Sequence, residues 1–135
     1  MNLNTKGSKH PSAPEIIKSG IFDNVLNFQQ LKKRISNTKP LNGKNKSQTE
    51  GDIFEIFCEG YLTFERRFQT IKVYPQAATP LEIQIKLNLP SYDDGWDGVY
   101  ETTDGKFATY QAKFRTKNER IKWADDGGLS TTAAR

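Results

Sequence analysis

The chain has 135 residues, of which 35% are hydrophobic and 27% charged, with 20 lysines and arginines against 16 acids. This length and composition predict one domain with a modest core, and the net charge of +4 suits a polyanionic partner. One cysteine, Cys58, excludes an internal disulfide, and no apolar run reaches the roughly 20 residues of a membrane span. We therefore expect a cytoplasmic protein without a membrane segment.

The first part of the chain divides into two stretches. Residues 1–19 are mostly polar and contain Pro11 and Pro14, so we predict a flexible segment and assign no role to His10. Residues 20–46 then predict an accessory helix followed by a basic connector. The helix prediction rests on apolar side chains at helical spacing, Ile21, Val25, Phe28, Leu31 and Ile35.

A second helix is predicted from about residue 48 to residue 62. Ser47 with Glu50 fits a capping box at its start. Glu55 falls at the edge of the apolar face, where an acid either faces the end of a sheet or is an ordinary rim charge. Cys58 lies on the apolar stripe, which favours a core residue over a nucleophile.

Three strands and a short helix follow. Residues 68–74 alternate between apolar and polar side chains and predict the first strand. Residues 80–87 predict a short helix, because the preceding threonine and the proline at its start are typical of a helix N-terminus. Residues 96–103 and 106–115 predict a hairpin joined at an Asp-Gly turn.

The loop length of this hairpin decides which side chains share a face. A two-residue loop would pair Asp97 with Ala112 and send the acid to the wrong face. A three-residue loop, with Gly105 at positive φ, would put Asp97 opposite Gln111 and on the face that Lys113 shares. We predict the three-residue loop.

These residues resemble the PD-(D/E)XK nuclease superfamily, and within it the Mrr-like nuclease domains at the N-termini of restriction helicases. The resemblance spans about residues 47–116 and rests on Phe54-Glu55, the DDGWD stretch at 93–97, and Gln111-x-Lys113. It implies an α/β, restriction-endonuclease-like core over residues 47–135: a helix, a three-stranded mixed sheet with a hairpin, and a second helix starting near Leu129. Because that fold has a further strand, we expect the protein to continue beyond residue 135.

The resemblance also implies the chemistry. The catalytic residues would be Glu55, Asp97, Gln111 and Lys113. The ligands of a Mg²⁺ ion, for which Mn²⁺ would substitute, would be Asp97, Gln111, Glu55 and the backbone carbonyl of Ala112. Gln111 is neutral where most of the superfamily has an acid, so the metal should bind more weakly. Glu50 is the alternative helix acid, and Asp94 is a candidate ligand for a second metal ion.

Basic residues on both sides of this site are candidates for contacts with DNA phosphates, with a solvated surface as the alternative: Arg115, Lys117, Arg120, Lys122, Lys44 and Lys46. The leading hypothesis is a metal-dependent DNA endonuclease domain of a larger restriction, helicase or mobile-element protein, in which a homodimer is one arrangement. One alternative is a non-catalytic DNA-binding module with a degraded site. The other is a protein-interaction domain with an accidental motif.

Overall fold

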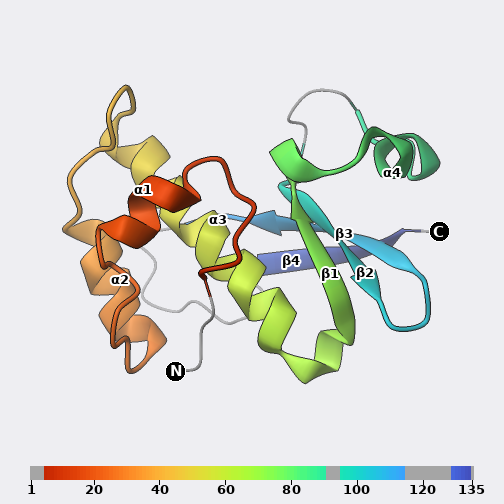
Figure 1. The fold of residues 1–135 in the computed structure, drawn as a ribbon, viewed down its shortest axis with the longest axis horizontal. Helices are drawn as coiled ribbons and strands as arrows, with labels where there is room; N and C mark the ends of the chain where they lie inside the picture. Colours follow the sequence, from red (N-terminus) through yellow and green to blue (C-terminus); the bar gives the residue numbers. More distant parts are fainter. Residues whose placement is uncertain (1–4, 91–94, 115–128, 135) are drawn as a thin grey trace.

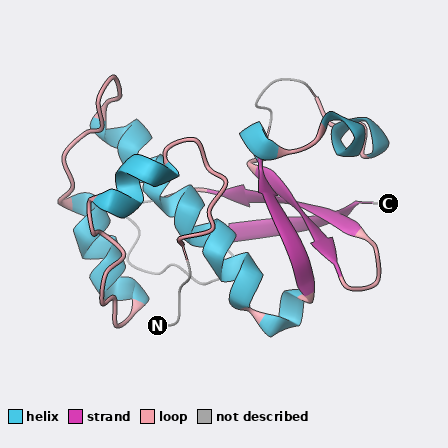
Figure 2. Ribbon diagram, viewed as in Figure 1, coloured by secondary structure: helices cyan, strands magenta, loops and turns pink. Residues whose placement is uncertain are grey.

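A long helix, residues 46–64, packs against one face of a four-stranded sheet in the computed structural model, which describes residues 5–90, 95–114 and 129–134 (Figure 1). The elements in chain order are α1 (Ala13–Lys18), α2 (Phe28–Ser36), α3 (Lys46–Phe64), β1 (Thr70–Pro75), α4 (Leu81–Lys86), β2 (Gly98–Thr102), β3 (Phe107–Ala112) and β4 (Leu129–Ala134). Figure 2 shows α1, α2 and α3 together beside the sheet and α4 apart from them. None of the helices in the described ranges is both long and apolar enough to cross a membrane.

The sheet has the strand order β1-β2-β3-β4, and every neighbouring pair is antiparallel. The prediction of a mixed sheet is therefore wrong for these strands. Leu129 begins β4 rather than a second helix, and the sequence gives a reason, since two β-branched threonines in LSTTAA favour a strand. β4 pairs with β3 from Phe107 to Ala112, so β3 has a neighbouring strand on both sides.

The central helix α3 is longer than predicted and is capped at a different residue. Asn45 is its N-cap: the Asn45 side chain accepts from the Gln48 N–H at 2.8 Å, and the Gln48 side chain accepts from the Asn45 N–H at 3.0 Å. This reciprocal pair takes the place of the predicted Ser47–Glu50 box. The apolar face of α3 is buried as predicted, and Cys58 is a fully buried core residue.

The segment for which we predicted flexibility is structured from residue 5 onward. It contains α1, whose Ala13 and Ile16 are only 2% and 1% exposed and belong to the main core. Pro14 in the first turn of α1 is the sequence signal that points to this helix. The apolar pair Ile16-Ile17 then supplies the face that packs against the rest of the domain.

The accessory helix starts later than predicted. The helix α2 begins at Phe28 rather than near residue 20, because the Asn27 side chain caps it by accepting from the Gln30 N–H at 2.9 Å. Asn24, at φ 53°, interrupts the chain before this cap. Val25 is still buried in the core, although it lies in the loop that precedes the helix.

The two faces of the sheet carry separate apolar clusters. The larger cluster lies between α3 and the sheet and includes Tyr100, Ala108 and Tyr110. The smaller one, around Trp96 and Val99, lies on the opposite face near α4, because side chains alternate along a strand. The short helix α4 confirms the predicted insertion between the first two strands.

Candidate active site

The hairpin of β2 and β3 has the predicted three-residue loop. The Thr102 N–H donates to the Lys106 carbonyl at 2.8 Å, and the Gly105 N–H donates to the Thr102 carbonyl at 3.0 Å. Gly105 has a φ of 80°, in the left-handed region that a residue with a side chain rarely adopts. The loop length and the positive φ of Gly105 are therefore confirmed.

The Asp97 carboxylate lies against the backbone of β3, just before β2 begins. Its Oδ2 accepts from the Ala112 N–H at 2.6 Å, while the Asp97 N–H donates to the Tyr110 carbonyl at 2.8 Å. The regular ladder of the two strands ends with Gly98 opposite Tyr110, one pair short of the predicted pair of Asp97 with Gln111. The acid therefore contacts the residue between Gln111 and Lys113 rather than pairing in the ladder with Gln111.

By the geometry of an antiparallel strand, the Ala112 carbonyl faces the same side of β3 as the Ala112 N–H that Asp97 accepts. In an antiparallel pair, every second residue directs both its N–H and its carbonyl toward the neighbouring strand. Because Thr102 pairs with Lys106, the residues that face β2 in this way are Lys106, Ala108, Tyr110 and Ala112. The strand β2 does not extend as far as Ala112. The Asp97 side chain accepts the hydrogen bond of the Ala112 N–H in place of a carbonyl of β2. A carboxylate oxygen is thus held at the end of β3, on the side of the strand that the Ala112 carbonyl also faces, and hard cations such as Mg²⁺ prefer oxygen ligands.

Gln111 and Lys113 lie on either side of Ala112 along the chain. Gln111 is half-buried and Lys113 is exposed. Ala112 and Phe114 pack against the main core, so by alternation Gln111 and Lys113 belong to the other face of the strand. Asp97 contacts the backbone between them, at the Ala112 N–H.

The helix α3 carries Glu55 and contacts the chain just after β3. Phe54 contacts Phe114, with ring centroids 5.6 Å apart, whereas the charge of Glu59, further along α3, acts on Tyr110. The helix and the strand therefore run in opposite directions. Glu55 follows Phe54 in the helix and precedes Glu59. The neighbour of Glu55 in the helix, Phe54, is thus in contact with the chain just after β3, and the choice between Glu55 and Glu50 as the helix acid stays a prediction.

The negative charges of Glu55 and Asp97 both raise the pKa of two buried groups. Burial raises the pKa of the Cys58 thiol well above its ordinary value, and the negative charges of Glu55 and Asp97 raise it further. Burial likewise raises the pKa of Tyr110, with added contributions from Glu59, Cys58, Glu55 and Asp97 in that order. Both carboxylates therefore act on the same thiol and on the same phenol.

His10, to which the sequence assigned no role, contacts Glu55. Its side chain is 8% exposed, and its Nε2 lies 2.9 Å from Glu55 Oε1. The Ser12 N–H donates to His10 Nδ1 at 3.1 Å, so Nδ1 holds a lone pair and the proton of the neutral ring is on Nε2. Sequence reasoning missed this residue because its partner lies 45 positions away and its segment was predicted to be flexible.

Asp52 lies one turn before Glu55 on α3 and has partners of its own. Its Oδ2 accepts from Ser12 Oγ at 2.8 Å and forms an ion pair with Lys44. Lys44, a predicted DNA contact, is therefore engaged within the molecule, whereas Lys46 is exposed. The other predicted DNA contacts and the alternative ligand lie outside the described residues: Arg115, Lys117, Arg120, Lys122 and Asp94.

His10, Asp52 and Glu55 form a group whose donor atoms lie within 4.8 Å of one another. A histidine with two carboxylates would suit a borderline metal such as Zn²⁺. The protonated Nε2 and the Lys44 ammonium already satisfy these acids, so the group is a hydrogen-bond network in this state. The oxygen donors at Asp97 and Ala112, with Glu55, fit Mg²⁺ better.

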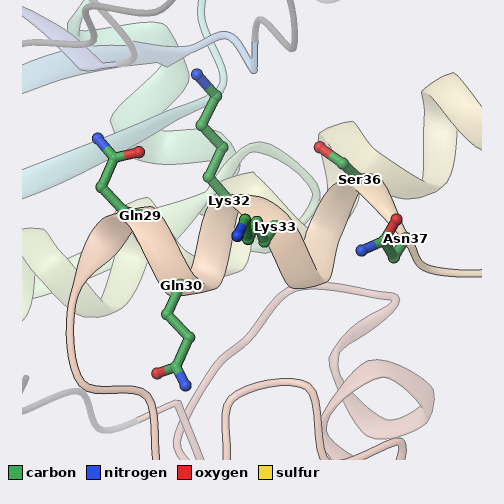
Figure 3. A pocket seen from close by; sticks show the side chains of 6 residues that line it. All are labelled: Gln29, Gln30, Lys32, Lys33, Ser36 and Asn37. Carbon is green, nitrogen blue, oxygen red and sulfur yellow. The ribbon is translucent and has the colours of Figure 1, made fainter.

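A hollow of about 1050 Å³ lies away from this site along α2. Its lining is polar and basic: Gln29, Gln30, Lys32, Lys33, Ser36 and Asn37 (Figure 3). Figure 3 shows Gln29 and Lys32 projecting from one side of α2 and Gln30 from the opposite side. The described residues that line it include no acid that could bind a metal ion, so we place the candidate chemistry at Asp97.

No family model matches the chain, and no curated protein or solved structure is significantly similar to it. The resemblance to the PD-(D/E)XK nucleases therefore rests on the residues quoted above.

Proposed function

We propose that the chain is a Mg²⁺-dependent endonuclease domain that hydrolyses phosphodiester bonds in DNA. The observation that carries the proposal is the contact of the Asp97 carboxylate with the Ala112 N–H, between Gln111 and Lys113. It places an acid that precedes β2 beside the backbone of β3, at the residue between a glutamine and a lysine. This is the combination that a metal-dependent phosphodiesterase needs.

Each residue has a distinct role in this proposal. Asp97, the Ala112 carbonyl and Glu55 would hold the metal ion, and the Gln111 amide oxygen would add an uncharged ligand. When bound, Mg²⁺ would lower the pKa of a water molecule and stabilise negative charge on the phosphate. The exposed Lys113 ammonium would orient the attacking water and stabilise the transition state, and the exposed Lys46 would contact a DNA phosphate.

The experiment is a plasmid-nicking assay with Mg²⁺ or Mn²⁺. Asp97→Asn removes the charge but keeps an oxygen that can accept the Ala112 N–H, so we expect a folded protein whose cleavage rate falls at least about 100-fold. Asp104→Asn is the matched control, because Asp104 is an exposed acid of the same hairpin. Lys113→Ala should likewise reduce cleavage, whereas Lys106→Ala, an exposed lysine of the same hairpin, should not.

A non-catalytic DNA-binding module is the second candidate. The neutral Gln111 favours it, because Asp97 would be the only charged ligand supplied by the two strands. In that case the protein would bind DNA in a salt-dependent way without metal-dependent cleavage, and Asp97→Asn would leave binding unchanged. Metal-dependent cleavage that is equal in the wild type and in Asp97→Asn would refute the proposed active site.

A further inference from the structure

The N-terminal segment, residues 8–12, lies along one side of α3. Three acids share this side of the helix, because their spacing of three and four residues corresponds to about one turn each: Asp52, Glu55 and Glu59. Each acid accepts a hydrogen bond from the segment: Glu59 from Ser8 Oγ and from the Lys9 N–H, Glu55 from His10, and Asp52 from Ser12 Oγ. The three contacts differ in what they do to the charge of the acid.

Of these three acids, Glu55 is the one whose negative charge is still able to bind a cation. Asp52 is neutralised by the Lys44 ammonium, and Glu59 is 5% exposed and enclosed by the segment. The side chain of Glu55 is 31% exposed, and its hydrogen-bond partner is the uncharged imidazole of His10. A neutral donor fixes a carboxylate without cancelling its charge.

The orientation of His10 is itself fixed. The Ser12 N–H holds the ring through Nδ1, which leaves the Nε2 proton directed at Glu55 Oε1. The His10 N–H in turn donates to Ser8 Oγ at 3.2 Å, so the backbone on both sides of the ring is tied down. The bond uses one oxygen of the carboxylate, so a metal ion near Asp97 would be offered Glu55 Oε2.

We propose that His10 is a positioning residue, which holds the Glu55 carboxylate in the orientation needed to bind the divalent cation at Asp97 and Ala112. This inference rests on the proposed nuclease function. Hydrogen bonds from a protein group to a metal-binding side chain orient that ligand, and their loss costs roughly 10–100-fold in metal affinity or activity. Without His10, Glu55 would rotate freely about its side-chain bonds.

The test compares the full chain with its His10→Ala and His10→Gln variants. Mn²⁺ binding is measured by calorimetric titration, and plasmid nicking is measured across a range of Mn²⁺ concentrations. We expect His10→Ala to weaken Mn²⁺ binding roughly 10–100-fold and to raise the half-activating Mn²⁺ concentration by the same factor. Cleavage at saturating Mn²⁺ should change little. His10→Gln keeps an N–H donor near the Nε2 position and should restore most of the affinity.

Ser12→Ala is the matched control, because it removes the hydroxyl bonded to Asp52 but keeps the N–H bonded to the His10 ring. It should leave the half-activating Mn²⁺ concentration unchanged. A purely structural role for His10 would instead lower the melting temperature and the amount of active protein at an unchanged Mn²⁺ requirement. That result, or tighter Mn²⁺ binding in His10→Ala, would overturn the inference while leaving the nuclease proposal intact. A wild-type chain that neither binds Mn²⁺ nor cuts DNA would overturn both.

Discussion

Replacing Gly98 by alanine should destabilise the domain, because the Tyr110 side chain occupies the space of the new methyl group. The two residues are directly opposite each other in the hairpin of β2 and β3. A Cβ on Gly98 would lie 2.3 Å from Tyr110 Oη, 2.4 Å from Cζ and 2.5 Å from Cε1. Ordinary contacts of a Cβ begin near 3.4 Å, so the ring would have to move by about an ångström.

The cost follows from how tightly Tyr110 is held. The residue is 2% exposed, so its ring cannot move without displacing the core under α3. Overpacking of this kind costs about 1–3 kcal/mol, and we expect the upper half of this range because three ring atoms overlap. Replacing a glycine inside a strand returns about 0.5–1 kcal/mol. The net loss should be about 1–2 kcal/mol, which lowers the melting temperature by roughly 3–10 °C.

A double-mutant cycle isolates this contact. Tyr110→Val removes the ring, keeps a strand-forming residue, and should itself cost roughly 2–4 kcal/mol. In that background Gly98→Ala should cost nothing or stabilise slightly, which gives a coupling energy of about 1–3 kcal/mol. Urea unfolding of the four proteins, followed by tryptophan fluorescence, measures each term. An equal cost of Gly98→Ala in both backgrounds would refute this account of the hairpin.

Two further predictions concern buried ionisable groups. Ser8→Ala should cost about 1–3 kcal/mol in urea unfolding, because Glu59 would lose one of its donors while 5% exposed, whereas the exposed Ser47→Ala should stay within about 0.5 kcal/mol. Stability should also fall as pH rises above about 8.5, because the unfolded chain releases the Cys58 proton that the folded state retains. The slope should approach about 1.4 kcal/mol per pH unit and double above about pH 10, where Tyr110 adds its contribution. A flat stability profile from pH 8 to 11 would contradict the raised pKa values.

Local sequence determined the features whose causes lie within a few residues. The loop of the hairpin follows from Gly105, because a positive φ is easily adopted only by a residue without a side chain. The central helix and its buried face follow from apolar spacing, which a helix converts into one continuous stripe. These two elements carry the candidate acids: Glu55 lies in α3, and Asp97 precedes β2 and contacts the end of β3.

Tertiary structure decided everything that depends on distant partners. The segment before α1 looks flexible by composition, yet it is held by acids that lie more than 40 positions away, and this is why His10 escaped sequence reasoning. The same holds for Lys44. The sequence predicted that it contacts DNA, whereas in the folded chain it forms an ion pair with Asp52. The direction of the strands and the pairing of β4 also arose from long-range contacts. Composition and periodicity report which faces are apolar, but a polar side chain acquires its role only from the partner that folding brings to it.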